Sequence, residues 1–195
     1  MIRSLLLACL LAVGVGQIAG ATGTHVKAWL GQALLERAWS RAGRSDEPEM
    51  PWPGAVSHPI ARIEVPALNV DRLVLKGAET PVLAWGPGME VGPKGHRLIA
   101  AHRDTHFNFL KDLKGGDRVK LALADGRIEH WAVAQRSVVD SRRFGLNLAA
   151  SGDRMSWVTC WPFNAIEPGG PLRLLVTLHR TSSPDDEQAG RGLEL

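Results

Sequence analysis

The stretch Ser156-Trp157-Val158-Thr159-Cys160-Trp161-Pro162-Phe163 decides both the fold and the chemistry expected of this chain. An apolar run reaches Cys160 and stops at Pro162, which has no amide hydrogen to continue the ladder of a sheet. Cys160 is therefore expected at the end of a strand, at the rim of whatever the sheet encloses. The only other cysteine is Cys9, in an apolar N-terminal segment. A lone thiol in the folded part has no disulfide partner there, so its reactivity is the property to explain.

The composition of the chain is that of one globular domain rich in turns. Its 21 glycines and 12 prolines favour short strands joined by tight turns over a helical bundle. A hydrophobic fraction of 45% is enough for a packed core. The formal charge is only +3 and acids alternate with bases, so no basic block indicates nucleic-acid binding.

Short segments with strand character recur between turn signals over residues 60–180. They are Ala61–Val65, Asn69–Lys76, His96–His102, Asp117–Ala124, Arg127–Val139, Ser156–Cys160 and Leu172–His179. Two short helical segments are also expected, Thr80–Trp85 and His106–Leu113. Seven or eight short strands with two small helices predict an all-β fold, a closed or nearly closed β-barrel. Residues 181–195 are polar and glycine-rich, and we expect a disordered tail there.

The N-terminal residues 1–25 have the pattern of an export signal. Arg3 precedes a long stretch without charge, and Ala19-Gly20-Ala21 is a candidate cleavage site. The stretch is also long enough to span a bilayer if it is not cleaved. We therefore expect a signal peptide or membrane anchor with the rest of the chain exported. Cys9 is interpreted as a small membrane hydrophobe, because the apolar run before it is too short for a lipoprotein signal.

Residues 26–59 are expected to form a juxtamembrane helix followed by a proline-rich linker. The helix spans 26–43 and has an apolar stripe, made by Leu30, Ala33, Leu34, Ala38 and Trp39. Two placements stay open for it, at the bilayer surface or docked on the domain. The linker contains Pro48, Pro51, Pro53 and Pro59.

Two further side chains share the setting of Cys160. His102 ends the apolar stretch 97–101 and opens a polar turn, so two strand ends can bring a thiol and an imidazole to one rim. Arg173 lies in the apolar stretch 171–176, where a charge is costly without a partner or a role. An antiparallel return of the chain would set it beside Cys160, where it can stabilise a thiolate or bind an oxyanion. Taken alone, each residue also fits a purely structural role.

Three motifs in order resemble those of the sortase transpeptidases, and most closely the Gram-negative branch called class GN. They are Ala101-His102-Arg103-Asp104-Thr105, Thr159-Cys160-Trp161-Pro162-Phe163 and Leu172-Arg173. The resemblance covers residues 29–180 and includes the helix at 29–39, Pro51-Trp52-Pro53, Gly86-Pro87-Gly88 and 168–173. Three ordered motifs are far more specific than a cysteine motif alone.

The resemblance implies a closed eight-stranded barrel, anchored in the inner membrane with its catalytic domain, residues 60–180, in the periplasm. It implies cleavage of an LPXTG-like sorting signal between Thr and Gly. Cys160 would be the nucleophile, His102 the general acid and then base, and Arg173 the group that holds the substrate backbone and oxyanion. The partners would be a protein with a C-terminal sorting signal and an amine acceptor. No cofactor and no metal are expected.

Four further residues are candidates for contacts with the sorting signal. Thr159 and Trp161 flank the nucleophile, and Phe144 and Leu146 lie in the loop 140–153, where sortases recognise the leucine and proline of the signal. Thr159 and Trp161 also fit a packing role. The sequence departs from the usual pattern at two sites, because Ser156-Trp157 replaces Thr-Leu and Ala101 replaces glycine.

Two alternative functions stay open. One is a cysteine peptidase that acts mainly as a hydrolase, with water in place of the amine. The other is a non-catalytic, anchored β-barrel that serves as a binding module. The L,D-transpeptidases are excluded because their compact Ser/Thr-His-Gly-Cys motif is absent, and papain-like peptidases because they place cysteine before histidine.

Overall fold

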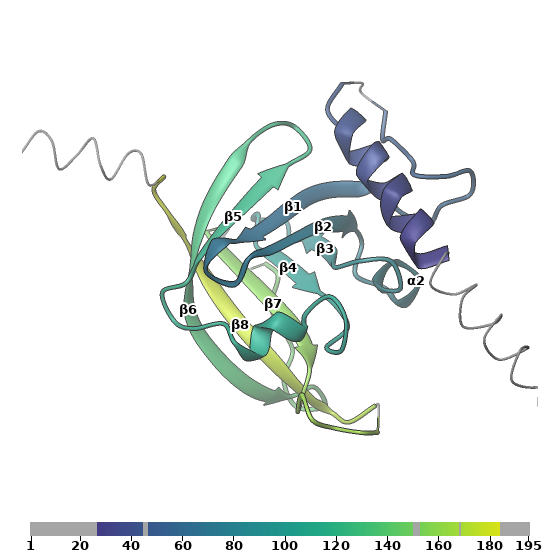
Figure 1. Ribbon diagram of the computed structural model, residues 1–195. Helices are drawn as coiled ribbons and strands as arrows, with labels where there is room; N and C mark the ends of the chain where they lie inside the picture. Colours follow the sequence, from purple (N-terminus) through teal and green to yellow (C-terminus); the bar gives the residue numbers. More distant parts are fainter. Residues whose placement is uncertain (1–26, 45–46, 150–152, 168, 184–195) are drawn as a thin grey trace, which may run out of the picture.

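The computed structural model describes residues 27–44, 47–149, 153–167 and 169–183. In this part of the chain the strands close into a barrel in the order β1-β2-β3-β4-β7-β8-β6-β5 (Figure 1). The signal peptide or anchor expected over 1–25 lies outside the described residues, as does most of the expected tail. Within the described ranges, no helix is both long enough and apolar enough to cross a membrane.

The elements follow the expected segments closely, with two additions, β3 and η1. The strands are β1 (Pro59–Val65), β2 (Val70–Lys76), β3 (Gly88–Val91), β4 (Arg97–Ala100), β5 (Arg118–Leu123), β6 (Ile128–Asp140), β7 (Arg154–Cys160) and β8 (Leu172–Thr181). The short helices are η1 (Pro66–Leu68), α2 (Thr80–Leu83) and η2 (Asn108–Lys111), and a longer N-terminal helix covers 27–41. Strand β3 was not among the segments expected, and it completes the barrel.

The barrel is mixed, and one of its parallel pairs positions the reactive groups. β2 runs parallel to β3, and β4 runs parallel to β7 with Ala100 opposite Val158. The other six neighbouring pairs are antiparallel. Parallel strands have their carboxyl ends on the same side of a sheet. The residues that follow β4 and end β7 therefore emerge at one rim, which we call the reactive rim.

Alternation along the strands fills the interior of the barrel. β1 buries Ala61, Ile63 and Val65 and leaves the residues between them half-buried. The rings of Phe107 and Trp157 are fully buried and stack with centroids 5.7 Å apart. Each large apolar side chain buried in this way stabilises the fold by roughly 1.5–3 kcal/mol. Trp157 thus anchors β7 in the core shortly before the strand ends at Cys160.

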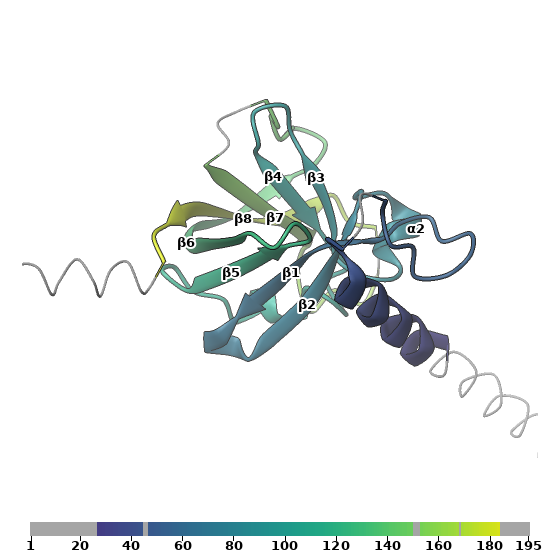
Figure 2. The same cartoon turned by 90° about the horizontal axis from the view of Figure 1, so that it is seen from above.

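The N-terminal helix docks on the barrel beside β2 and α2, which confirms one of its two expected placements (Figures 1 and 2). It contributes to a second apolar cluster, formed by Leu35, Leu73, Leu75 and Val82 with Trp39, Trp52 and Trp85 packed against them. The expected stripe was partly wrong, because Leu35 is buried whereas Leu30 is 50% exposed. Gly31 lies directly against the ring of Trp85, and this close contact turns the Leu35 face of the helix inward.

Candidate active site

The ends of β4 and β7 place His102 beside Cys160. The Ala101 amide donates to the carbonyl of Val158 at 3.3 Å, which continues the parallel ladder beyond β4. The Thr159 hydroxyl donates to the carbonyl of Ala101 at 2.8 Å. The residues just before His102 and Cys160 are therefore hydrogen-bonded to each other, and the two chains leave the sheet side by side.

The antiparallel pairing of β7 and β8 sets Arg173 directly opposite Cys160. Side chains in such a pair have Cβ atoms about 4.5–5.5 Å apart. The Arg173 guanidinium donates to the carbonyls of Gly170 and Leu172, the latter at 2.8 Å, so the loop that precedes β8 holds it. The three residues expected to carry the chemistry thus share the reactive rim.

The reactive rim is open to solvent. His102 is exposed, Cys160 is half-buried, and Arg173 is half-buried on the neighbouring strand. In the described part of the chain Cys160 is a free thiol. A thiol and an imidazole that both reach solvent can meet a substrate as large as a protein tail.

Arg103 is a functional candidate that sequence reasoning quoted within a motif but gave no role. Its side chain is buried, with a residue exposure of 8%, and donates to Asp104 at 2.7 and 2.9 Å. It also donates to the carbonyl of Pro162, and to that of Ala165 at 3.1 Å. The Asp104 carboxylate raises the pKa of Arg103, and Cys160 adds a smaller electrostatic contribution in the same direction. The feature of the sequence that could have indicated a role for Arg103 is its place between His102 and Asp104.

The electrostatics of this turn favour the charged forms of Arg103 and Asp104 and the neutral form of His106. The Arg103 guanidinium lowers the pKa of Asp104, and His102 lowers it further. Burial lowers the pKa of His106, and the charges of Arg72 and His102 act in the same direction. His106 also lines a groove of about 590 Å³ between this turn, β2 and the N-terminal helix.

The four candidates for substrate contact occupy different environments. Thr159 is only 2% exposed, and its hydroxyl is bonded to the backbone before His102, so it supports that backbone. Trp161 is half-buried, packs against the core and makes an edge contact with Phe163 at 5.7 Å. Phe144 is 43% exposed and Leu146 is half-buried, both in the loop after β6.

The loop that carries Phe144 and Leu146 is held at two points. At its start, the Ser141 amide and hydroxyl donate to the carbonyl of Pro171 at 2.9 and 2.8 Å. Hydrogen bonds from Arg142 lower the pKa of Asp140 to about 2, so this carboxylate stays charged. Further along, the carbonyl of Leu148 packs so tightly on Gly92 that a Cβ there would overlap it. The loop therefore begins beside Arg173 and is held against the turn between β3 and β4.

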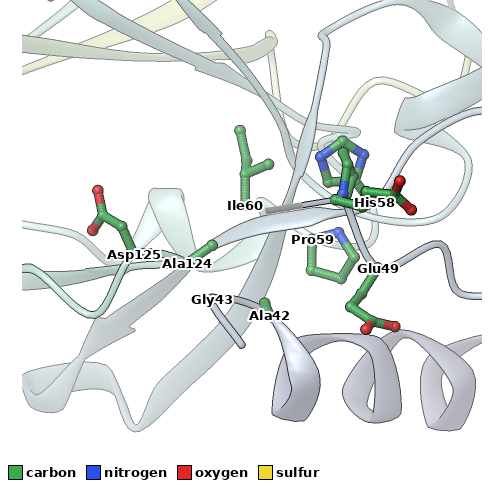
Figure 3. A pocket seen from close by; sticks show the side chains of 10 residues that line it. Ala42, Gly43, Glu49, His58, Pro59, Ile60, Ala124 and Asp125 are labelled. Carbon is green, nitrogen blue, oxygen red and sulfur yellow. The ribbon is translucent and has the colours of Figure 1, made fainter. Parts of the chain in front are cut away.

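A separate cavity of about 220 Å³ lies at the other end of the strands (Figure 3). Its lining includes Glu49, His58 and Asp125, from the linker, the start of β1 and the β5–β6 turn. Cys160, His102 and Arg173 do not line this cavity. Among the described residues, no group of three or more His, Cys, Asp or Glu side chains is arranged to hold a metal ion.

Comparison with known proteins identifies the family. A family model described as the sortase domain matches residues 63–181, which is more than half of the chain. The chain belongs to the sortase family, and sortases are cysteine transpeptidases. Sortase D of Bacillus subtilis (strain 168) is 24% identical over 119 residues, covering 58% of this chain. The chain spans about 60% of the length of that curated relative.

Solved structures show the same fold. Sortase A from Corynebacterium diphtheriae matches with a TM-score of 0.57 at 24% identity, over 82% of this chain and 86% of that one. The Clostridium perfringens Sortase D5 transpeptidase matches with a TM-score of 0.58 at 20% identity, over 78% of this chain and 99% of that one. The expected eight-stranded sortase-like barrel is therefore confirmed, and it is a mixed sheet.

Proposed function

We propose that this chain cleaves an LPXTG-like sorting signal between Thr and Gly through a thioacyl-enzyme and transfers the protein to an amine acceptor. The observation that carries the proposal is the pairing of Cys160 opposite Arg173 on β7 and β8, with His102 leaving the adjacent parallel strand. A nucleophile, a proton carrier and a permanent cation at one open rim are the groups that acyl transfer needs.

In the first half-reaction the Cys160 thiolate attacks the carbonyl carbon of the threonine. The carbonyl oxygen becomes an oxyanion, which the Arg173 guanidinium stabilises as a donor of charge-assisted hydrogen bonds. The protonated His102 imidazole gives its proton to the glycine nitrogen as the C–N bond breaks. The products are a thioester on Cys160 and a free glycine amine.

In the second half-reaction an amine attacks the thioester carbonyl, and neutral His102 accepts the proton that the amine loses. The tetrahedral adduct collapses, the C–S bond breaks, and Cys160 leaves as a thiolate while a new amide forms. Hydrolysis is the second candidate outcome, with water in place of the amine. The exposure of His102 supports it, because solvent reaches the group that would activate water.

Phe144, Leu146 and Trp161 are proposed to contact the leucine and proline of the signal. The loop of Phe144 begins beside Pro171, next to Arg173, which supports a groove running from this loop towards Cys160. The ring of Phe144 is 43% exposed and is therefore accessible to an apolar side chain of the signal.

The cellular setting and the class are also proposals. The uncharged N-terminal stretch supports a single-pass anchor in the inner membrane with the catalytic domain in the periplasm. A single cysteine in the exported part supports this setting, because an unpaired thiol has no internal partner with which to be oxidised. The class GN proposal rests on the resemblance over residues 29–180, which includes the N-terminal helix and Pro51-Trp52-Pro53.

The test is mass spectrometry of the enzyme incubated with a panel of Leu-Pro-x-Thr-Gly peptides that vary at the third and flanking positions. We expect the mass of the enzyme to rise by that of the peptide up to threonine, on Cys160, for at least one peptide. Addition of glycine peptides or a lysine-type amine should then give the amide in excess over the hydrolysed acid. A wild-type enzyme that forms no adduct with any peptide would contradict the proposed function.

A further inference from the structure

Two sets of hydrogen bonds, which we call ties, join the chain around His102 to the chain around Cys160. One lies before these two residues, where the Thr159 hydroxyl donates to the Ala101 carbonyl at 2.8 Å. The other lies after them, where Arg103 donates to the carbonyls of Pro162 and Ala165. His102 and Cys160 stand between these ties, one on each chain. The two chains are thus fastened to each other on both sides of the groups that must cooperate.

In the second tie, the buried guanidinium of Arg103 has hydrogen-bond partners for its donors. Arg103 is buried among the turn that follows Cys160, and a buried guanidinium is costly unless its donors are satisfied. Here Nε and Nη2 bind the Asp104 carboxylate as a fork, while Nη1 and Nη2 bind the two carbonyls. The planar fork of arginine presents these donors in fixed directions, which a lysine cannot reproduce.

We propose that Arg103 is a positioning residue that ties the turn at 161–165 to the end of β4 and so sets the geometry between the Cys160 thiol and the His102 imidazole. The inference rests on the proposed function, because it assigns Arg103 a part in that acyl transfer. A general acid works only within hydrogen-bond reach of the group that it protonates. A displacement of about 1 Å at a reacting group costs about a hundredfold in rate.

The position of Arg103, not its charge, carries the effect. The Asp104 carboxylate neutralises Arg103 at hydrogen-bond distance, and 69% of the Asp104 side chain is exposed to screening solvent. The charged and titratable groups around Cys160 are Arg173 on β8, and His102 with the Arg103–Asp104 pair after β4. Arg103 also interacts with the Cys160 charge, but Asp104 is its main partner, and Arg173 is the cation directly opposite Cys160 in the register of β7 and β8.

Two reactions of the same thiol separate position from charge. Formation of the thioacyl-enzyme with a sorting peptide requires both Cys160 and a correctly placed His102. Alkylation by iodoacetamide requires only the Cys160 thiolate. We would measure both rates in single turnovers across pH 6–9, together with the thermal midpoint of unfolding, for wild type and for the variants Arg103→Gln and Arg103→Lys.

The matched control is Arg136→Gln. Arg136 is another arginine whose guanidinium donates to backbone carbonyls of a turn, those of Leu113 at 2.6 Å and Leu110 at 2.9 Å. Its ties fasten the η2 turn and not the residues around Cys160. We expect this variant to lose thermal stability while its rate of thioacyl formation per folded molecule matches wild type.

For Arg103→Gln we expect thioacyl formation to fall about a hundredfold, with the rate and pH profile of alkylation close to wild type. Arg103→Lys should recover part of the loss, because an ammonium group can bind one of the two carbonyls. Should Arg103→Gln fail to fold, Asp104→Asn loosens the fork while Arg103 keeps both carbonyls. That variant should show a smaller selective loss of thioacyl formation.

Two results would overturn the inference. Equal losses in thioacyl formation and alkylation would show that Arg103 acts through its charge on the thiol. Thioacyl formation at the wild-type rate in Arg103→Gln, or in Asp104→Asn if that variant is the one tested, would leave Arg103 a purely structural tie. Absence of an adduct in wild type is a different failure, because it contradicts the proposed function itself.

Discussion

The two ends of the barrel use the same kinds of charged group for opposite purposes. At the end away from Cys160, the buried Glu129 accepts hydrogen bonds from Arg97 at 2.7 Å and from the Trp131 indole at 3.2 Å, and it pairs with Arg180. The two guanidinium groups also lie 5.9 and 5.5 Å from the Trp131 ring. At the reactive rim, His102 is left open to solvent and Cys160 is half-buried. At the Glu129 end, buried charges with hydrogen-bond partners stabilise the fold. At the reactive rim, the exposure of His102 and Cys160 makes them available for reaction.

The largest effect expected from this contrast is on activity at the rim. Cys160→Ala should lower the rate of sorting-peptide cleavage by roughly a thousandfold or more, because no other side chain there can form the thioester. The thermal midpoint should stay near that of wild type, since a half-buried thiol contributes little packing. The measurement is peptide cleavage by chromatography, paired with a melting curve. Cleavage at the wild-type rate would remove Cys160 from the mechanism.

Glu129→Ala should show the reverse pattern. Removal of this carboxylate leaves Arg97 partly buried without its partner, which costs about 3–5 kcal/mol in the free energy of unfolding. Urea denaturation measures this loss, and cleavage per folded molecule should be close to wild type. A variant as stable as wild type would show that the cluster is dispensable.

Arg173→Ala should lower kcat/KM for the peptide about a hundredfold, because the oxyanion loses its charged donor. Arg173→Lys should be less damaging, since it restores the charge without the planar fork. The control is the thermal midpoint, which should change little for a residue whose donors bind only its own loop. Equal activity in all three proteins would exclude Arg173 from the chemistry.

The smallest expected effect is on the pH dependence of stability through His96. This residue is 1% exposed, its Nε2 lies 3.0 Å from the Ser156 hydroxyl, and burial is the main cause that lowers its pKa, with a smaller contribution from Arg154. A histidine with a lowered pKa in the folded state stabilises the protein above its unfolded pKa of about 6.5 and loses this contribution as pH falls.

Wild type should therefore lose more stability between pH 7.5 and 5.5 than His96→Gln does. The measurement is urea denaturation at both pH values. Burial also lowers the pKa of His58 and His106, so the variant should retain part of the slope. An identical slope in the two proteins would show that His96 does not take part in acid destabilisation.

The sequence predicted the positions at which strands end more readily than it predicted how chain segments pack. Pro162 and the polar turn after His102 are local signals, so the two strand ends were recognised without any knowledge of pairing. β3 was missed because Gly88–Val91 is short and lies between glycine and proline, with no alternation long enough to detect. The face of the N-terminal helix was misjudged because the Gly31–Trp85 contact, and not the apolar stripe alone, determines its rotation.

The role of Arg103 was hidden for a similar reason. Its identity and its aspartate neighbour are visible in the sequence, but its targets are backbone carbonyls, which every residue has. Only the path of the turn at 161–165 brings the Pro162 and Ala165 carbonyls to it. A hydrogen bond from a side chain to a distant backbone carbonyl requires no particular residue type at the acceptor, so it cannot be recognised in the sequence.

The parallel pairing of β4 and β7 also makes the site depend on contacts between distant parts of the chain. The Thr159–Ala101 bond joins residues 58 positions apart, and Arg173 enters only with the last strand. Contacts this distant form late, because the intervening loop must close first. A chain in which β8 has not yet paired with β7 therefore holds Cys160 without Arg173 opposite it.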